Sequence, residues 1–232
     1  MNKISCCAFL MTFFMCSAVS AATFGYSLRR CKDLMHENPP QIEVVYSFGS
    51  LHLDNSRDAD GIKEVFKQIH PNQKVRKING LTVLSPHAIV ENNIMAEMIG
   101  EYICYYPQRV QINVGYTPVV YISKDLTKNR CRFTLTVRHE QTHLDIGHLS
   151  LQIFARRLKK EFSDIVESIG PVLKLPNEKV LNADDVAKEM NETYHKHLKS
   201  LFDDFVQKLL EENARIDNDE NYDYEQNLCP NP

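Results

Sequence analysis

The 232-residue chain is predicted to fold as an α+β protein, with a strand-rich N-terminal half packed on a long antiparallel helical hairpin. Apolar residues alternate with a period of two in residues 42–46 and 110–114, which is typical of half-buried strands. From about Thr134 the apolar period changes to 3.6, and two helical stripes follow. Strands followed by helices, rather than alternating with them, indicate the α+β class.

The composition is that of an ordinary globular protein, with 43% hydrophobic and 25% charged residues. The formal net charge of −3 at pH 7 lacks the basic excess of a protein that binds nucleic acid or an anionic membrane. The chain has eight glycines and no glycine-rich phosphate loop, which argues against nucleotide binding. We therefore expect a peptide or protein partner, and no nucleic acid.

Residues 1–22 have the organisation of a signal peptide, with a basic residue, an uncharged apolar run and small residues before Thr23. The run ends in Ser-Ala-Val-Ser-Ala-Ala, which favours cleavage after Ala21 or Ala22 over an uncleaved anchor. A lipid-anchored form would use Cys16, but Met15 before it is larger than such sites accept. We expect a periplasmic or secreted mature protein without a membrane span.

Four cysteines remain in the mature chain, at positions 31, 104, 131 and 229. In an oxidising compartment four cysteines predict two disulfides, and three pairings are possible. The alternative is a thiolate metal site, but the mature chain has no C-x-x-C spacing. We therefore favour disulfides and leave their connectivity open.

Residues 23–232 are interpreted as one domain with three parts, namely a strand-rich part at 23–135, the helical hairpin at 136–216 and an acidic tail at 217–232. The tail is expected to be irregular. Within the strand-rich part a helix is expected at 60–69, ended by Pro71.

Two further segments of the strand-rich part carry local signals. Asn79-Gly80, between KVRKI and LTVLS, predicts a β-hairpin with a type I′ turn. Segment 88–104 fits either a helix, from its four-residue apolar spacing, or a strand, from its β-branched content.

Each helix of the hairpin is predicted from one apolar stripe. The first stripe stops at Gly170-Pro171 and consists of Leu151, Phe154, Leu158, Phe162, Ile165 and Ile169. The second helix starts near residues 182–184, fades by about Ile216, and its stripe consists of Val186, Met190, Tyr194, Leu198, Leu201, Phe205 and Leu209. Antiparallel pairing would bring together residues whose numbers sum to about 353.

The motif that carries chemistry is His139-Glu140-Gln141-Thr142-His143, an H-E-x-x-H pattern at the start of the first helix. Residues four apart lie about 40° apart around a helix, so both imidazoles project from one face and can bind one Zn²⁺. Glu140 then flanks an open metal position, where it can act as general base toward a zinc-activated water. The alternative is a solvated helix face with two incidental histidines.

The run VRHEQTHLDIGHLSLQIFARRLKKE, residues 137–161, resembles the zincin metallopeptidases and more closely a bacterial family of predicted secreted zinc-dependent proteases. The matching positions are His139, Glu140, Gln141, His143, Asp145, Ile146, Ala155, Arg156 and Arg157. The family also has Tyr-Asp after its last helix, which this chain keeps as Tyr222-Asp223, whereas the later Thr and His-Gly of the family are absent. The resemblance implies a zinc-dependent peptidase.

The first helix itself offers no third metal ligand. His148 points about 180° away from His139 on a straight helix, and its spacing differs from that of the zincins with a third histidine. Glu161 lies on the right face but about 33 Å along the axis. Asp145, about 240° round, is better placed to orient a ligand or a loop than to bind.

The hairpin register instead places the end of the second helix and the acidic tail beside His143. Asp223 is the favoured third ligand because the family keeps Tyr-Asp, and Glu211 and Glu212 are the alternatives. His195 and His197 would face residues near 157, about 20 Å from the metal, and are interpreted as surface or core residues.

These observations predict an exported zinc-dependent peptidase that hydrolyses peptide bonds. Residues 110–123 are interpreted as a sheet edge that aligns an extended substrate by strand addition. The alternative is a non-catalytic cell-envelope protein in which the zinc site is structural or lost.

Overall fold

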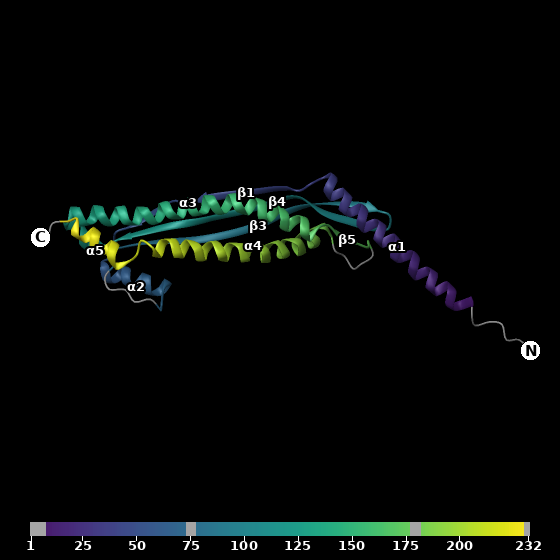
Figure 1. The fold of residues 1–232 in the computed structure, drawn as a ribbon, viewed down its shortest axis with the longest axis horizontal. Coiled ribbons are helices and arrows are strands. Elements are labelled where there is room, and N and C mark those ends of the chain that lie inside the picture. Colours follow the sequence, from purple (N-terminus) through teal and green to yellow (C-terminus); the bar gives the residue numbers. More distant parts are fainter. Residues whose placement is uncertain (1–7, 73–77, 177–181, 230–232) are drawn as a thin grey trace, which may run out of the picture. The chain divides into compact units, whose positions relative to one another are not determined.

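The computed structural model describes residues 8–72, 78–176 and 182–229. Over these residues the protein is α+β, with a mixed five-stranded sheet and five α-helices, which confirms the α+β part of the predicted fold class (Figure 1). In chain order the elements are α1 (Ala8–Glu37), β1 (Gln41–Phe48), β2 (His52–Asp54), α2 (Ala59–Ile69), β3 (Gly80–Ile99), β4 (Tyr102–Ile122), the 3-10 helix η1 (Lys124–Lys128), α3 (Arg130–Ile169), β5 (Val172–Lys174), α4 (Ala183–Ala214) and α5 (Asp219–Asn227).

Strand β4 is the centre of the sheet, because it pairs with each of the other four strands. β2 runs parallel to it, with Leu53 opposite Val120, and β5 runs antiparallel, with Leu173 opposite Cys104. The turn between β3 and β4 contains Gly100, whose φ of 62° lies in the left-handed region that favours glycine. The interpretation of residues 110–123 as a sheet edge is therefore wrong, since alternation shows that a segment is a strand but not which neighbours it has.

The contacts between Cα atoms divide the chain into two compact units, and each is described by itself. The first unit contains residues 1–43, 90–111 and 162–196, and the second contains residues 44–89, 112–161 and 197–232. The long strands and helices contribute to both units, and the H-E-x-x-H motif belongs to the second.

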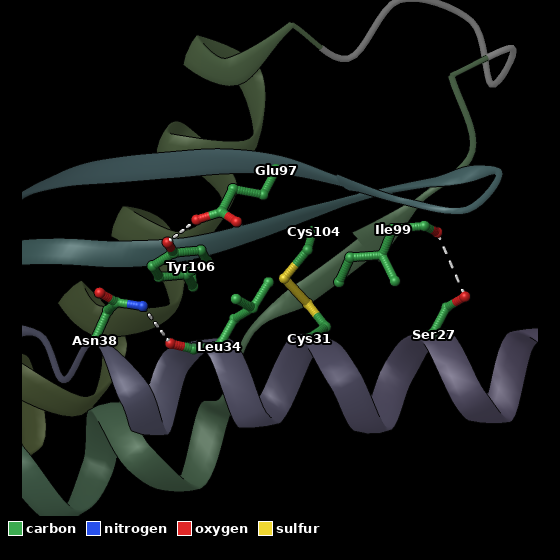
Figure 2. The surroundings of a disulfide bond; sticks show 8 residues. All are labelled: Ser27, Cys31, Leu34, Asn38, Glu97, Ile99, Cys104 and Tyr106. Atoms are coloured by element: carbon green, nitrogen blue, oxygen red, sulfur yellow. Dashed lines mark hydrogen bonds between the residues drawn. A yellow bond between two sulfur atoms is a disulfide. The ribbon is translucent and has the colours of Figure 1, made fainter.

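In the first unit, α1 is attached to β4 by the disulfide Cys31–Cys104 (Figure 2). Ser27 Oγ donates a hydrogen bond to the carbonyl oxygen of Ile99 at 3.4 Å, on the same side of the helix. Leu34 and Met35 are also buried, so the helix presents a stripe at positions 27, 31, 34 and 35. The strand-rich part therefore begins after Glu37 and not at residue 23. The helical spacing of positions 27, 31, 34 and 35 is the sequence signal that could have predicted this helix.

In the second unit, α3 begins after Asn129, whose side-chain oxygen accepts a hydrogen bond from the backbone N–H of Arg132 at 3.1 Å. Helix α4 contacts α3 through Phe154 and Phe205, whose stacked rings have centroids 4.5 Å apart. Both residues are buried and belong to the predicted stripes. This contact places the second half of α4 beside the middle of α3.

Several local predictions can be compared with the described residues. The helix expected at 60–69 forms as α2, with Asp58 Oδ1 accepting from the N–H of Gly61 at the N-cap. Segment 88–104, which fitted either a helix or a strand, forms the end of β3 and the start of β4. The tail, expected to be irregular, forms α5, and Asn218 Oδ1 caps it by accepting from Asn221 N at 2.9 Å. The first strand of the hairpin expected around Asn79-Gly80, KVRKI at residues 74–78, lies outside the described residues except for Ile78.

The cysteines at positions 31, 104, 131 and 229 form the pairs Cys31–Cys104 and Cys131–Cys229, which settles the connectivity left open by the sequence. Two disulfides are compatible with an exported protein. Within residues 8–72, 78–176 and 182–229, no helix has the length and apolarity needed to cross a membrane.

Candidate metal centre

Three side chains of the second unit converge on one point and could hold a metal ion, namely His139, His143 and Asp217. The Nε2 atoms of His139 and His143 lie 3.0 and 3.1 Å from the same oxygen, Oδ1 of Asp217. One ligand atom from each residue lies within 4.8 Å of the other two. Both histidines are buried, with 5% and 7% of their surfaces exposed. The two-histidine pair predicted from the motif is thus present with a carboxylate beside it.

The second nitrogen of each histidine is also hydrogen-bonded. His143 Nδ1 lies 2.7 Å from Asn213 Oδ1, and Asn213 Nδ2 donates to the carbonyl oxygen of Leu209 at 2.8 Å. Because the Asn213 amide nitrogen donates to Leu209, Oδ1 faces the ring and accepts the Nδ1–H of His143. Neutral His143 with its proton on Nδ1 would offer the Nε2 lone pair to a metal ion, in place of the hydrogen bond to Asp217.

A carboxylate has the corresponding place beside His139. His139 Nδ1 lies 3.1 Å from Oε2 of Glu225, a residue of α5. A carboxylate behind a metal-binding imidazole fixes the ring orientation and raises its basicity. The donor set and the groups behind it therefore fit a metal ion such as Zn²⁺.

Asp217 and each of the two histidines stabilise each other's charged form. Burial alone would lower the pKa of each histidine, but the hydrogen bonds to Asp217 and the nearby carboxylates outweigh it and raise both pKa values. Burial opposes ionisation of Asp217 as well, yet its hydrogen bonds to the two histidines hold the pKa of this carboxyl well below its usual range. Asp217 is therefore a carboxylate, the form that binds metals.

Glu140 is buried beside the two histidines, with 3% of its surface exposed. Thr82, near the start of β3, donates its hydroxyl to Glu140 Oε2 at 2.8 Å. Burial raises the pKa of Glu140, and the charge of His143 and the hydrogen bond from Thr82 offset part of this rise. The Glu140 carboxyl thus lies in a buried environment that raises its pKa above the ordinary value of a glutamate.

Gly80 makes room for the Glu140 side chain. A Cβ atom at position 80 would lie 2.6 Å from Thr136 Cγ2 and closer still to Glu140 Oε1. The backbone of β3 can therefore approach α3 this closely only without a side chain at this position.

We expect Gly80→Ala to lower the free energy of unfolding by about 1–3 kcal/mol, the usual cost of overpacking. Gly25→Ala is the matched control, because a Cβ at Gly25 meets nothing within 4 Å. Denaturant unfolding of the two variants measures the difference, and equal stabilities would contradict the close approach of β3 to Glu140.

Tyr222 of α5 is the remaining polar side chain of the centre. Its hydroxyl donates to Asp217 Oδ1 at 3.1 Å, and its ring lies 5.1 Å from that of His139 between centroids. Burial and the neighbouring carboxylates raise the pKa of Tyr222, so the phenol stays protonated as a hydrogen-bond donor. From the sequence, Tyr222 is part of the Tyr-Asp match to the family and is not predicted to belong to the site.

The favoured third ligand, Asp223, is exposed and does not join the group. The alternatives also point elsewhere, since Glu211 accepts from Gln207 Nε2 at 3.0 Å and Glu212 pairs with Arg215 at 3.1 Å. The structure brings Asp217 to the two histidines instead. The sequence-based register pointed to this end of α4, but the direction of the chain after Ala214 cannot be read from helical periodicity.

The other residues weighed as ligands lie apart from the centre. The His148 ring contacts Phe48, with centroids 4.1 Å apart. Glu161 pairs with Arg157 at 3.3 Å, and His195 and His197 are exposed on α4.

A search of protein-family models, of curated proteins and of solved structures found no match for this chain. The resemblance to secreted zinc-dependent proteases therefore stays a prediction from residues 137–161.

Asp217→Asn removes the charged oxygen that both histidines share, and we expect it to weaken zinc binding by about two orders of magnitude. Asp223→Asn makes the same chemical change six residues along the chain, at an exposed side chain, and should leave the affinity within about threefold. Competition with a chelator measures both affinities. If Asp223→Asn has the larger effect, the ligand inferred from the resemblance is the right one.

Proposed function

We propose that this protein is an exported zinc-dependent peptidase, with His139, His143 and Asp217 as metal ligands and Glu140 as general base. The observation that carries the proposal is the convergence of two imidazole nitrogens and one carboxylate oxygen within 4.8 Å. Two nitrogens and one oxygen are the donor set of peptidase zinc sites that keep a fourth position for water or substrate.

The residues that contact the Nδ1 atoms of the two histidines also support the proposed metal site. Asn213 and Glu225 each contact the Nδ1 atom of one histidine, so both rings are held with Nε2 toward Asp217. Such partners are typical of metal-binding histidines, and they are less expected for two histidines that are incidental to the helix.

When bound, Zn²⁺ would polarise the scissile carbonyl group and lower the pKa of a water molecule. Glu140 would accept the proton of the attacking water and deliver it to the leaving amine. Thr82 keeps the Glu140 carboxylate in one orientation through its 2.8 Å hydrogen bond. The protonated phenol of Tyr222, which donates to Asp217 Oδ1 in this structure, would have to turn its O–H toward the substrate to act as a neutral donor for the negative charge that develops on the carbonyl oxygen.

An extended substrate would approach along β3. β3 pairs with β4, and no second strand partner of β3 occurs among the described residues. Its first residues include Gly80 and Thr82, which lie against Glu140. Strand addition to β3 would therefore bring a peptide backbone next to the base, in the role that the sequence analysis gave to residues 110–123.

The second candidate is a non-catalytic cell-envelope protein in which the metal braces α3 against the tail. It is favoured by the low exposure of Glu140, 3%, and by the number of tail groups that contact the histidines. Metal analysis of the purified mature protein, together with an assay on a denatured protein substrate, separates the candidates. About one zinc per chain with turnover supports the peptidase, and zinc without turnover supports the brace.

A further inference from the structure

The tail after α4 supplies three groups to the metal centre, Asp217, Tyr222 and Glu225. This segment has almost no apolar anchor of its own. Among the side chains described between residues 215 and 229, Cys229 alone is buried, whereas Tyr222 and Tyr224 are 39% and 64% exposed. Hydrophobic packing therefore contributes little to holding the tail in place.

The covalent anchor of the tail is the disulfide between Cys229 and Cys131. Cys131 is the second residue of α3, about two helical turns before His139. The tail is thus held at one end by its continuation from α4, and at the other by a bond to the helix that carries the two histidines. Asp217, Tyr222 and Glu225 all lie between these two attachments.

We propose that Cys131–Cys229 is a positioning disulfide of the metal centre, and that metal affinity depends on it. The inference rests on the proposed metal site. Without the bond, the tail would be ordered only by hydrogen bonds to the histidines and by weak packing. Each of these contributes little net free energy compared with the entropy lost when a segment of this length is ordered.

The dependence must be reciprocal, because a ligand that binds the disulfide-bonded form more tightly protects that form by the same factor. Zinc should therefore favour the oxidised form of Cys131–Cys229 at equilibrium. Because bound zinc also keeps the tail from opening locally, it should slow the reduction of this bond. Cys31–Cys104 serves as an internal control, because it joins α1 to β4 within the first unit, whereas the metal-centre residues belong to the second. The two bonds also differ in access, since Cys131 is exposed whereas Cys31 and Cys104 are fully buried.

The first test compares two double variants of the full mature chain. We expect Cys131→Ser/Cys229→Ser to weaken zinc binding at least about tenfold, as measured by chelator competition. Cys31→Ser/Cys104→Ser should bind within about threefold of the unmodified protein, since its disulfide is in the other unit. Equal affinities of the unmodified protein and the Cys131/Cys229 variant would overturn the inference and leave the metal site intact. Absence of zinc binding by the unmodified, oxidised protein would overturn the proposed function, and the inference with it.

A second measurement uses the unmodified protein and does not depend on a variant that folds. A water-soluble phosphine with low metal affinity reduces each disulfide to two thiols and becomes the phosphine oxide, with oxygen taken from water. Alkylation of the new thiols and mass spectrometry give a reduction rate for each bond with and without zinc. Because bound zinc suppresses local opening of the tail, we expect it to slow the reduction of Cys131–Cys229 at least about fivefold and to leave Cys31–Cys104 unchanged. A disulfide that merely stabilises the fold would show no such selectivity, so equal ratios for the two bonds would refute the positioning role.

Discussion

Replacement of His139 or His143 by alanine is expected to abolish stoichiometric zinc binding. Each change removes one of two nitrogen donors that face the same Asp217 oxygen at 3.0 and 3.1 Å. A site left with one imidazole and one carboxylate loses most of its affinity, so elemental analysis after dialysis against a weak chelator should find less than about a tenth of the zinc of the unmodified protein.

His195→Ala is the matched control, because this histidine is exposed on α4 and belongs to the other unit. It should keep full metal content. Each variant is first shown to be folded by far-UV circular dichroism, since both motif histidines are buried. Full metal occupancy in His139→Ala or His143→Ala would remove the basis for the candidate metal centre.

Glu140→Gln is expected to keep zinc and to lower peptidase turnover by several orders of magnitude. Glutamine retains the size of Glu140 and can still accept the hydrogen bond from Thr82, which is 2.8 Å in the native protein. It cannot take a proton from the attacking water, so the chemical step loses its base.

The same variant distinguishes the two candidate functions. If the metal is only a brace between α3 and the tail, Glu140→Gln should alter neither metal content nor activity, because there is no turnover to lose. Gln141→Glu is a useful control, since it places a carboxylate on the neighbouring exposed position of the same helix. Turnover by the Glu140→Gln variant at the native rate would rule out the proposed base.

The sequence predicted those features that depend on local periodicity. The change of apolar period near Thr134 located α3, the later stripe located α4, and the H-E-x-x-H spacing located His139, Glu140 and His143. These predictions need only the geometry of one helix, because residues four apart share a face whatever surrounds them.

The rest depends on contacts between residues far apart in the chain. Thr82 and Glu140 are separated by 58 positions, and His139 and Asp217 by 78. No period in the sequence specifies which residue of a tail returns to a helix face. The preference for Asp223 over Glu211 and Glu212 pointed to the acidic tail, and the structure groups Asp217, another residue of that tail, with the two histidines.

Two helices were missed for a different reason. Helix α5 is short and has few apolar residues, so it leaves a faint hydrophobic pattern. The end of α1 has a buried stripe at positions 27, 31, 34 and 35, but this stripe is only about two helical turns long. Both segments are held by disulfides, Cys31–Cys104 and Cys131–Cys229. Four cysteines also allow three pairings that composition cannot separate.

The separation of 74 positions between His143 and Asp217 has a consequence for synthesis. A chain is made from its N-terminus at about 5–20 residues per second, so roughly 4–15 seconds pass between the two residues. During this interval the histidines of α3 exist without the carboxylate, and Cys131 exists without Cys229. The centre is therefore completed after translation has passed both long helices, and the nascent chain cannot bind metal through the full donor set before then.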